Sequence, residues 1–420
     1  MDARYIALAV PLFFVLIGVE LLVSLRQGQR LYRFHDAVTS MSCGIGQQLL
    51  GLLFVAIELA IYTLLYERFR IATISPASPL AWAALLLGVD LGYYAYHRAS
   101  HRVGFLWAMH IVHHQSEEYN LSTALRQSWF TGAVAWVFYA PLALLGFPPI
   151  MLVAMRTLNT LYQFWIHTRA VGRLGWLEGV LNTPSLHRVH HGIDPRYIDR
   201  NYAGILIVWD QLLGTLQREE REPVYGTVEP LSSWNPAWAN VEHWAALAAR
   251  AGRTRRLRDK LLVWIMPPEW RPADLGGPVT VPEVSRATHR KYETPAPRGL
   301  DVYVGLSFVL TVAATTALLW HQQALSAPVI VVIASLVLVG LSVWGGLFEA
   351  RRWAPPLEWA RLAAAAALAA WLARDTPAFI PVLAGGAAAA LALSLWIARY
   401  RDPPPTAPRF ASEPDIAGLR

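Results

Sequence analysis

Three histidine motifs decide how this sequence is interpreted. They are the HxxxH motif His97-Arg98-Ala99-Ser100-His101, the HxxHH motif His110-Ile111-Val112-His113-His114, and a second HxxHH motif, His187-Arg188-Val189-His190-His191. On a helix, residues three and four positions apart share a face. Each motif is therefore expected to point its imidazoles in one direction.

These eight imidazoles outnumber the ligands of one metal ion, because a protein zinc site normally takes three or four. The count predicts two metal ions held side by side. All-nitrogen ligation favours a transition metal over magnesium or calcium, which prefer oxygen. The alternative is a set of hydrogen-bonded structural histidines. Ionisable residues within membrane segments are costly and usually functional, which favours the metal site.

The spacing between the first two motifs predicts a break in the chain. His101 and His110 are nine residues apart, which is about two and a half helical turns and places them on opposite faces of one helix. Both can serve one site only if the helix bends or ends between them. We expect that break at Gly104.

The composition is that of an integral membrane protein. Of the 420 residues, 55% are hydrophobic and only 15% are charged, whereas soluble proteins carry about 25% charged residues. The single cysteine, Cys43, excludes a disulfide framework and a thiolate metal site. The net charge of +7 requires no nucleic-acid partner, because excess arginine in a membrane protein belongs on cytoplasmic segments.

The apolar runs predict an all-α polytopic membrane protein with about eight to nine transmembrane helices. Five runs lie in the first half of the chain and four in the second: about 5–25, 44–66, 79–100, two within 126–168 that are separated near Gly146-Phe147-Pro148-Pro149, and then 302–320, 328–348, 357–373 and 378–398. A helix needs ~20 apolar residues to span a bilayer, and these runs approach or reach that length.

A polar segment, residues 169–300, separates the two halves and holds 18 of the 36 lysines and arginines. We expect a catalytic domain over 1–300 with 169–300 as a cytosolic cap, a helical bundle over 301–400 and a disordered tail over 401–420. Placing the basic segments inside puts all three histidine motifs at the cytoplasmic membrane surface. Lys260 and Lys291 are the only lysines, a bias that suggests a bacterial inner-membrane protein.

Further polar residues share helix faces with the motifs. Asp90, His97 and His101 lie on one face, so Asp90 could accept the ring N–H of a metal-bound histidine or bond to a neighbouring helix. Asn159, Gln163 and His167 are spaced by four; His167 is a ninth ligand candidate, whereas Asn159 and Gln163 could face a cavity or join helices. No special role is predicted for the isolated histidines His35, His243, His289 and His321.

The motifs resemble those of the membrane fatty acid hydroxylase and sterol desaturase superfamily. The segments WAMHIVHHQSEEYNLSTALRQ (107–127) and LEGVLNTPSLHRVHHGIDPRYIDRNYAGILIVWDQLLGTL (177–216) look most like its alkylglycerol monooxygenase branch. The resemblance implies a non-haem centre of two iron ions, held by the eight motif histidines with His167. It also implies that O2 and two electrons, from tetrahydrobiopterin or another donor, oxidise a C–H bond of a membrane lipid.

The resemblance also carries over further residues as candidates for supporting the metals or binding substrate: Asn120, Arg126, Asn182, Asn201 and Asp210. For each, a structural role in capping, turns or surface pairing remains an alternative. One position departs from the branch. The residue after the second histidine is acidic in the alkylglycerol enzymes, but it is Arg102 here, which puts an acidic role at that position in doubt.

Several functions remain open from the sequence. The leading hypothesis is a lipid oxygenase, acting on ether lipids or as a sterol or fatty-acyl hydroxylase or desaturase. Hypotheses of another class are a metal transporter and a non-catalytic membrane protein. A transporter would spread its ligands along a path across the bilayer, whereas the motifs here gather at one surface. The sequence leaves the oligomeric state unknown.

Overall fold

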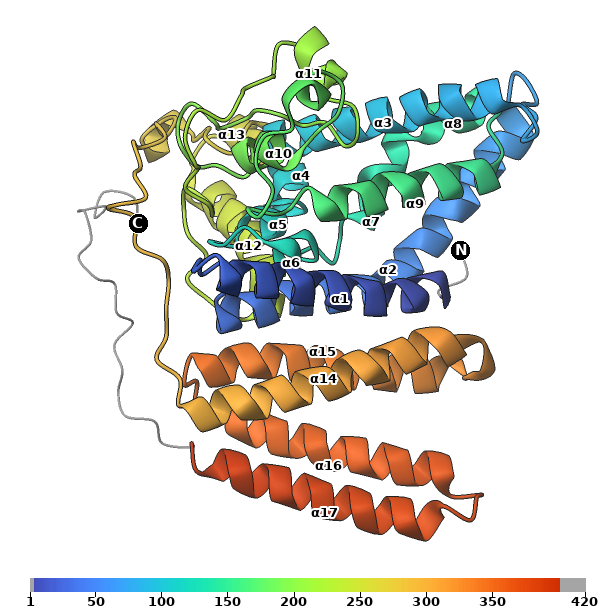
Figure 1. Ribbon diagram of the computed structural model, residues 1–420, viewed down its shortest axis with the longest axis vertical. Coiled ribbons are helices and arrows are strands. Elements are labelled where there is room, and N and C mark those ends of the chain that lie inside the picture. The colour runs from blue at the N-terminus through green and yellow to red at the C-terminus, as the bar shows by residue number, and fades with distance from the viewer. Residues whose placement is uncertain (1–3, 401–420) are drawn as a thin grey trace.

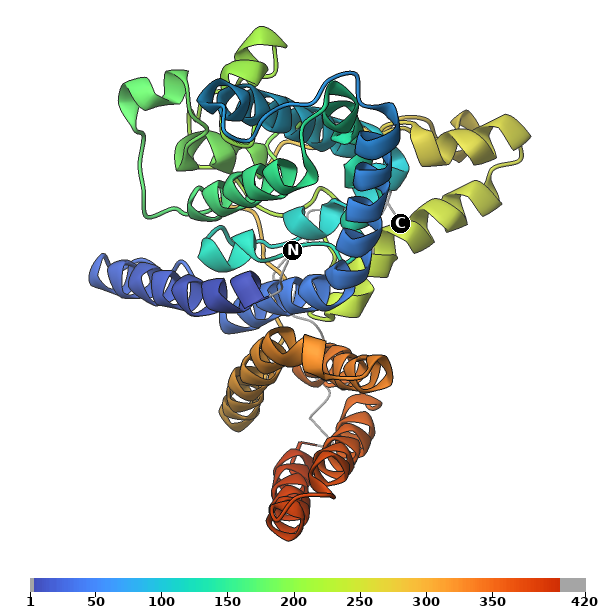
Figure 2. The same ribbon diagram turned by 90° about the vertical axis from the view of Figure 1, so that its right-hand side faces the viewer.

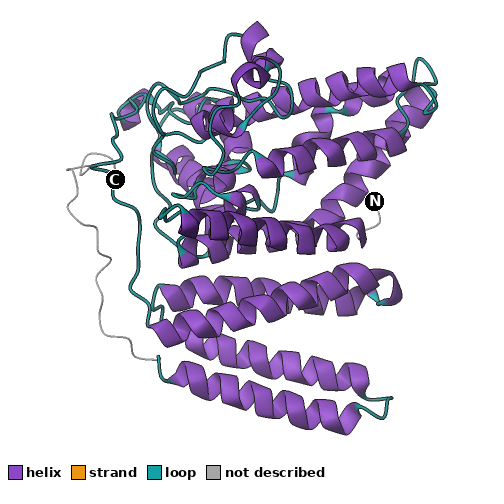
Figure 3. Cartoon of the chain, in the orientation of Figure 1, coloured by secondary structure: helices purple, strands orange, loops and turns teal. Residues whose placement is uncertain are grey.

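The computed structural model describes residues 4–400, and in this range it contains helices and loops without a strand (Figure 3). Only two isolated bridges are found there, Leu181 with Leu206 and Gly192 with Tyr225. The all-α prediction is therefore confirmed. The expected disordered tail, 401–420, lies outside the described residues.

The long helices of the first half surround the segments that carry the histidines. They are α1 (Arg4–Arg26), α2 (Phe34–Phe69), α3 (Pro79–Arg102) and α9 (Pro149–Trp165). Proline and serine set the start of α3, because Ser78 caps it by accepting a hydrogen bond from Ala81 N and Pro79 occupies its first turn. Buried residues of α2, α3 and α9 form one apolar core with α8 (Ala140–Leu145).

The region 126–168 differs from the expected pair of long helices. The turn at Gly146 is confirmed, with φ +103° and no room for a side chain, because a Cβ atom would lie 2.0 Å from Ala72 O. However, the part before it is divided into α7 (Gly132–Ala135), a 3-10 turn (Trp136–Phe138) and α8. Pro141, in the first turn of α8, lacks the N–H that a continuous helix would need.

The predicted cap is mostly irregular, as its polar sequence indicates. Its helices are α10 (Pro184–His190), α11 (Val208–Leu212), α12 (Pro236–Arg253) and α13 (Leu257–Ile265), and 3-10 turns occur at Gly175–Gly179 and Ala273–Leu275. In Figure 1 these helices gather at one end of α1, α3 and α9, together with the short helices α4 (Gly104–Ala108), α5 (Ile111–His114) and α6 (Leu121–Ala124).

The last four helices form layers on the first half (Figures 1 and 2). They are α14 (Arg298–His321), α15 (Ala327–Phe348), α16 (Ala354–Ala373) and α17 (Phe379–Ala398), with a 3-10 turn at Gln322–Ala324. Helix α14 packs on α1 and α2, α15 packs on α2 and α14, and α16 and α17 pack on each other farthest from the histidines.

Part of the predicted membrane topology is supported. Within residues 4–400, three helices are long and apolar enough to cross a membrane: Arg298–Ala324, Ala327–Phe348 and Phe379–Ala398. The number becomes four if Phe34–Gly51 and Phe54–Phe69, which are bent by 47°, form one span. The count of eight to nine spans is not confirmed and stays a prediction.

Candidate metal centre

The first histidine motif lies at the end of α3, and the chain turns immediately after it. Helix α3 ends at Arg102 and α4 begins at Gly104, so the predicted break is confirmed. Gly104 N donates a hydrogen bond of 3.0 Å to Met266 O, and a Cβ atom at Gly104 would lie 2.8 Å from Val263 O. Close packing against the chain around α13 therefore requires glycine here, and the turn brings His110 back toward His101.

The other two motifs occupy short helices. His113 and His114 lie in α5, and His110 is the residue just before that helix. His187 and His190 lie in α10, and His191 is the residue just after it. Each helix is less than two turns long, so packing rather than helix propensity holds it. Nearly all of their residues are buried.

The nine candidate histidines converge in two groups. In each group one nitrogen per residue lies within 4.8 Å of the others, and every member is buried. The groups are His97, His101, His110, His114 and His190, and then His113, His167, His187 and His191. They are adjacent, because the rings of His114 and His191 stack with centroids 4.4 Å apart. All the predicted histidines, including His167, are thus brought together.

Backbone carbonyls fix the orientation of four of these rings. The Nδ1 atoms of the four lie 2.7 to 3.0 Å from carbonyl oxygens: His97 from Tyr202 O, His113 from Arg126 O, His167 from Gln163 O and His190 from Arg200 O. Because a carbonyl only accepts, each Nδ1 must carry the proton. In a neutral imidazole the Nε2 atom is then a bare lone-pair donor.

These lone pairs fit a cation. The Nε2 atoms of His113 and His167 lie 3.1 Å apart, and neither carries a proton that could bridge them. The same Nε2 of His167 lies 3.0 Å from Nε2 of His187, and those of His110 and His114 are 3.2 Å apart. For metal–nitrogen bonds of about 2.1 Å, two ligands at a right angle are separated by ~3.0 Å. The donor set therefore fits a metal ion in each group.

The surroundings favour the neutral form of His113, His190 and His191, which is the form that binds metals. Burial lowers the pKa of His113 to about 4. Burial, followed by the charges of neighbouring histidines, lowers the pKa values of His190 and His191 well below the usual range. The buried Nε2 atoms of His190 and His191 have no hydrogen-bond partner within residues 4–400.

Three predicted residues hold the loop that supplies two of the carbonyls. Asn201 Nδ2 donates to Leu186 O at 2.9 Å and to Gln217 O at 2.7 Å. Asp210 accepts from the N–H groups of Tyr202 and Ala203, both at 2.9 Å, and Asn182 Nδ2 donates to Ala203 O at 2.7 Å. These bonds fix the loop around Arg200 and Tyr202, whose carbonyls hold His190 and His97.

Asp90 supports the same loop but does not bond to a histidine. Its carboxylate accepts hydrogen bonds from Ile205 N, Leu206 N, Trp209 Nε1 and Asn159 Nδ2, at 2.8 to 3.0 Å. Of the two roles considered for Asp90, the structure shows bonding to neighbouring segments. Gln163 Nε2 donates to Asn159 Oδ1 at 2.6 Å, so the polar face of α9 continues this network.

The remaining two candidates, Asn120 and Arg126, are buried beside the second motif. Asn120 caps α6 by accepting from Ser122 N at 3.0 Å, and its amide donates to Leu31 O at 2.7 Å. Arg126 Nε donates to Val112 O at 2.8 Å, while the Arg126 carbonyl holds His113. Both therefore make structural bonds, and Arg126 also orients a ligand candidate through its backbone.

Sequence reasoning missed an acidic residue that contacts the cluster. Asp199 Oδ1 lies 3.6 Å from His101 Nδ1, and the other carboxylate oxygen pairs with Arg102. Arg102, which replaces the expected acidic residue, thus contacts a carboxylate from a distant loop. Asp199 has φ +59°, and no sequence spacing connects it to His101.

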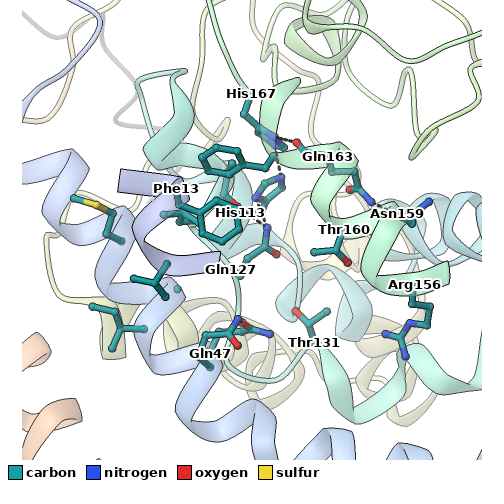
Figure 4. A pocket seen from close by; sticks show the side chains of 18 of the residues that line it. Phe13, Gln47, His113, Gln127, Thr131, Arg156, Asn159, Thr160, Gln163 and His167 are labelled. Carbon is teal, nitrogen blue, oxygen red and sulfur yellow. Dashed lines mark hydrogen bonds between the residues drawn. The ribbon is translucent and has the colours of Figure 1, made fainter. Parts of the chain in front are cut away.

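A cavity of about 340 Å³ leads away from the cluster between helices; we call it the helix cavity. His110, His113 and His167 lie on its wall. Figure 4 shows Gln163, Thr160 and Arg156 following one another along α9, with Phe13 on the opposite side. Helix α14 closes the wall with Phe308, Val312 and Leu319. The helix cavity thus joins the histidines to a largely apolar space.

Comparison with known proteins agrees with this site. The family model described as fatty acid hydroxylase matches residues 82–215, which include all nine histidines. The chain belongs to this superfamily, in its alkylglycerol monooxygenase branch, and it is an oxidoreductase of the monooxygenase class that acts on lipids.

The similarity to alkylglycerol monooxygenases extends over most of the chain. Alkylglycerol monooxygenase of Homo sapiens is 38% identical over 357 residues, covering 84% of this chain and 80% of the relative. The Danio rerio protein of that name is 37% identical, with 85% and 80% covered. Ornithine lipid hydroxylase of Rhizobium tropici is 30% identical but covers 34% of this chain and 44% of the relative. No solved structure matches.

Proposed function

We propose that this chain is a di-iron monooxygenase that cleaves the ether bond of alkylglycerol lipids. One observation carries the proposal: two adjacent groups of five and four buried imidazoles aim lone pairs at shared points beside an apolar cavity. The nine histidines would hold two iron ions, which supply the activation of O2. The extent of similarity to alkylglycerol monooxygenases, 84% of the chain, favours ether lipids over sterols.

The proposed reaction consumes one molecule of O2, two electrons and two protons. The C–H bond next to the ether oxygen receives one oxygen atom of O2. The other oxygen atom leaves as water, with two electrons and two protons from a reductant such as tetrahydrobiopterin. The product is a hemiacetal, whose C–O bond breaks to give a fatty aldehyde and a glycerol lipid.

The chain's own residues would position the substrate and exclude water. Phe13, Phe164 and Phe308 line the helix cavity, and burying an alkyl chain against them contributes about 0.8 kcal/mol for each CH2 group. Gln127 and Gln163 lie on the wall beside His113 and His167 (Figure 4), where their amides can bond to the glycerol hydroxyls. Apolar walls keep bulk water from the reacting carbon.

We also propose the placement of the site relative to the membrane. The basic segments 26–33 and 169–300 favour the cytoplasmic side for the histidines, so a lipid tail would enter from the bilayer and a reductant from water. Integral membrane location is supported by the apolar helices. Location in a bacterial inner membrane remains a prediction from the shortage of lysine.

The experiment that tests this function is turnover by purified protein in lipid nanodiscs. We expect fatty aldehyde from an alkylglycerol, with consumption of O2 that requires both lipid and reductant. His113→Ala and His190→Ala, one from each group, should abolish aldehyde formation. His321→Ala provides the matched control, because that histidine is exposed and lies outside both groups. Release of a hydroxylated sterol instead, with no aldehyde, would overturn the ether-lipid proposal.

A further inference from the structure

A second cavity reaches the histidines from the opposite side. It has a volume of about 150 Å³ and lies between the cluster, α12 and the segments around Glu229 and Arg271; we call it the cap cavity. His101, His114, His190 and His191 line it, whereas His110, His113 and His167 line the helix cavity. Within the described residues no side chain lines both cavities, so the cluster separates them.

The walls of the cap cavity carry more charged side chains than those of the helix cavity. Glu242, His243 and Arg250 enter it from α12, and Glu229 and Arg271 from the facing loops. Apolar side chains, among them Ile111, Ile193 and Val281, line much of the rest of it. The cap cavity therefore suits a small molecule that has both polar groups and an apolar or aromatic face.

Hydrogen-bonding groups in the cap cavity are buried without partners. His243 is 8% exposed, and its Nε2 atom has no partner within residues 4–400. The Nε atom of Arg271 is also buried and unpartnered there, although this side chain pairs with Glu229. Buried polar atoms are normally satisfied, so both atoms are available to bond to a ligand that enters the cavity.

The charges in the cavity are only partly balanced. Burial and then the Glu229 charge raise the pKa of Glu242, although the Arg250 charge offsets part of this shift. Burial and then the Arg271 charge lower the pKa of Arg250, although Glu229 and Glu242 offset part of that shift. A ligand that carries both donors and acceptors would relieve both groups.

An aromatic surface lies between these polar walls and the cluster. Trp107 lines the cap cavity, and its ring centroid is 4.9 Å from that of His101 and 5.4 Å from that of His114. A planar ring that stacks on Trp107 would thus sit directly beside imidazoles of the candidate metal centre.

We infer that the cap cavity binds the small-molecule electron donor, a planar reduced heterocycle that stacks near Trp107 and bonds to Glu242 and His243. This inference rests on the proposed function, because an oxygenase requires two electrons per turnover. The donor loses two electrons and two protons, which reduce the oxygen atom released as water. The two cavities then let lipid and reductant approach the histidines from separate sides.

The test separates the two substrates kinetically. In nanodiscs, initial rates are measured against 6-methyltetrahydropterin at saturating alkylglycerol, and against alkylglycerol at saturating pterin. Glu242→Gln and His243→Leu are expected to raise KM for the pterin by about tenfold, while kcat and the lipid KM stay within about twofold. Phe308→Ala, in the helix cavity, should raise the lipid KM alone. Glu283→Gln, an exposed carboxylate that does not line the cavity, should change neither.

A binding measurement keeps the inference independent of turnover. Calorimetric titration of lipid-free protein with oxidised 6-methylpterin should show binding that weakens by about tenfold in Glu242→Gln and in His243→Leu. Unchanged pterin KM and affinity in both cap variants would overturn the inference, as would turnover supported by a reduced ferredoxin but not by the pterin. Loss of all aldehyde formation with intact pterin binding would instead contradict the proposed function.

Discussion

His113 and His167 face each other with their Nε2 atoms 3.1 Å apart, although each ring already donates its Nδ1 proton to a backbone carbonyl. Two lone pairs at that distance repel unless a cation lies between them. His113 lies in α5 and His167 lies two residues after the end of α9, so the contact joins segments 54 positions apart. This relationship is the physical reason for assigning a metal to the four-histidine group.

Removal of one histidine should affect its own group first. We expect His113→Ala to lower bound iron to about half by weakening the four-histidine group, and His190→Ala to do the same for the five-histidine group. Elemental analysis of protein purified with iron measures this. His321→Ala should retain the full content. Equal and complete loss in both variants would show that the groups do not bind independently.

The loop that supplies the carbonyls should tolerate no side chain at Gly204. A Cβ atom there would lie 2.8 Å from Asn159 Nδ2 and 2.9 Å from Asp90 Oδ1. Gly204→Ala is therefore expected to shift the loop and to weaken iron binding by about 10- to 100-fold, the range typical of residues that support metal ligands.

Gly252→Ala is the matched control for that loop variant, because no atom lies within 4 Å of the added carbon. Competition with a chelator of known affinity measures both variants. Wild-type iron affinity in Gly204→Ala would show that the position of this loop does not control the histidines.

The C-terminal helices should influence substrate length through α14. Val312 lines the helix cavity, whereas Val309 on the same helix is 65% exposed. Val312→Phe should raise KM for long-chain alkylglycerols by about tenfold and affect short chains less, because one aromatic ring fills space that the tail needs. Steady-state kinetics over a series of chain lengths tests this. Val309→Phe should match the wild type at every length.

The cap cavity should make stability depend on pH through His243. Burial, and then the Arg250 charge, lower the pKa of His243 to about 4 in the folded protein, against about 6.5 when unfolded. Between these values the unfolded state binds more protons, so stability is lost as pH falls from about 6.5 to 4. His243→Gln should reduce the drop in melting temperature between pH 7 and 5. An unchanged drop would show that His243 does not resist protonation.

The gathering of the nine histidines could be predicted from the sequence because histidines in motifs carry their own geometric signal. The three spacings, and the position of His167 four residues after Gln163, were enough to predict all nine histidines that the structure gathers in the two groups. The break before His110 could be predicted too, since two residues nine positions apart, such as His101 and His110, lie on opposite faces of a continuous helix. The family was recognised from segments 107–127 and 177–216, and the comparisons confirm it.

The way in which other residues support the histidines could not be predicted, because it depends on contacts between distant segments that sequence spacing does not encode. Asp90 shares a helix face with His97, yet its carboxylate bonds to the loop around Ile205. The carbonyls of Tyr202 and Arg200 orient two histidines through the backbone, which leaves no mark on residue type. His243 was expected to be ordinary, and only its position on the cap cavity distinguishes it.

The central claim is that two metal ions share these imidazoles, and the most direct measurement is X-ray absorption of the purified protein combined with elemental analysis. The account predicts two iron ions per chain, each surrounded mainly by imidazole nitrogen at about 2.1 Å. Protein that is folded and binds one ion per chain, or whose metal has mostly oxygen or sulfur ligands, would contradict it.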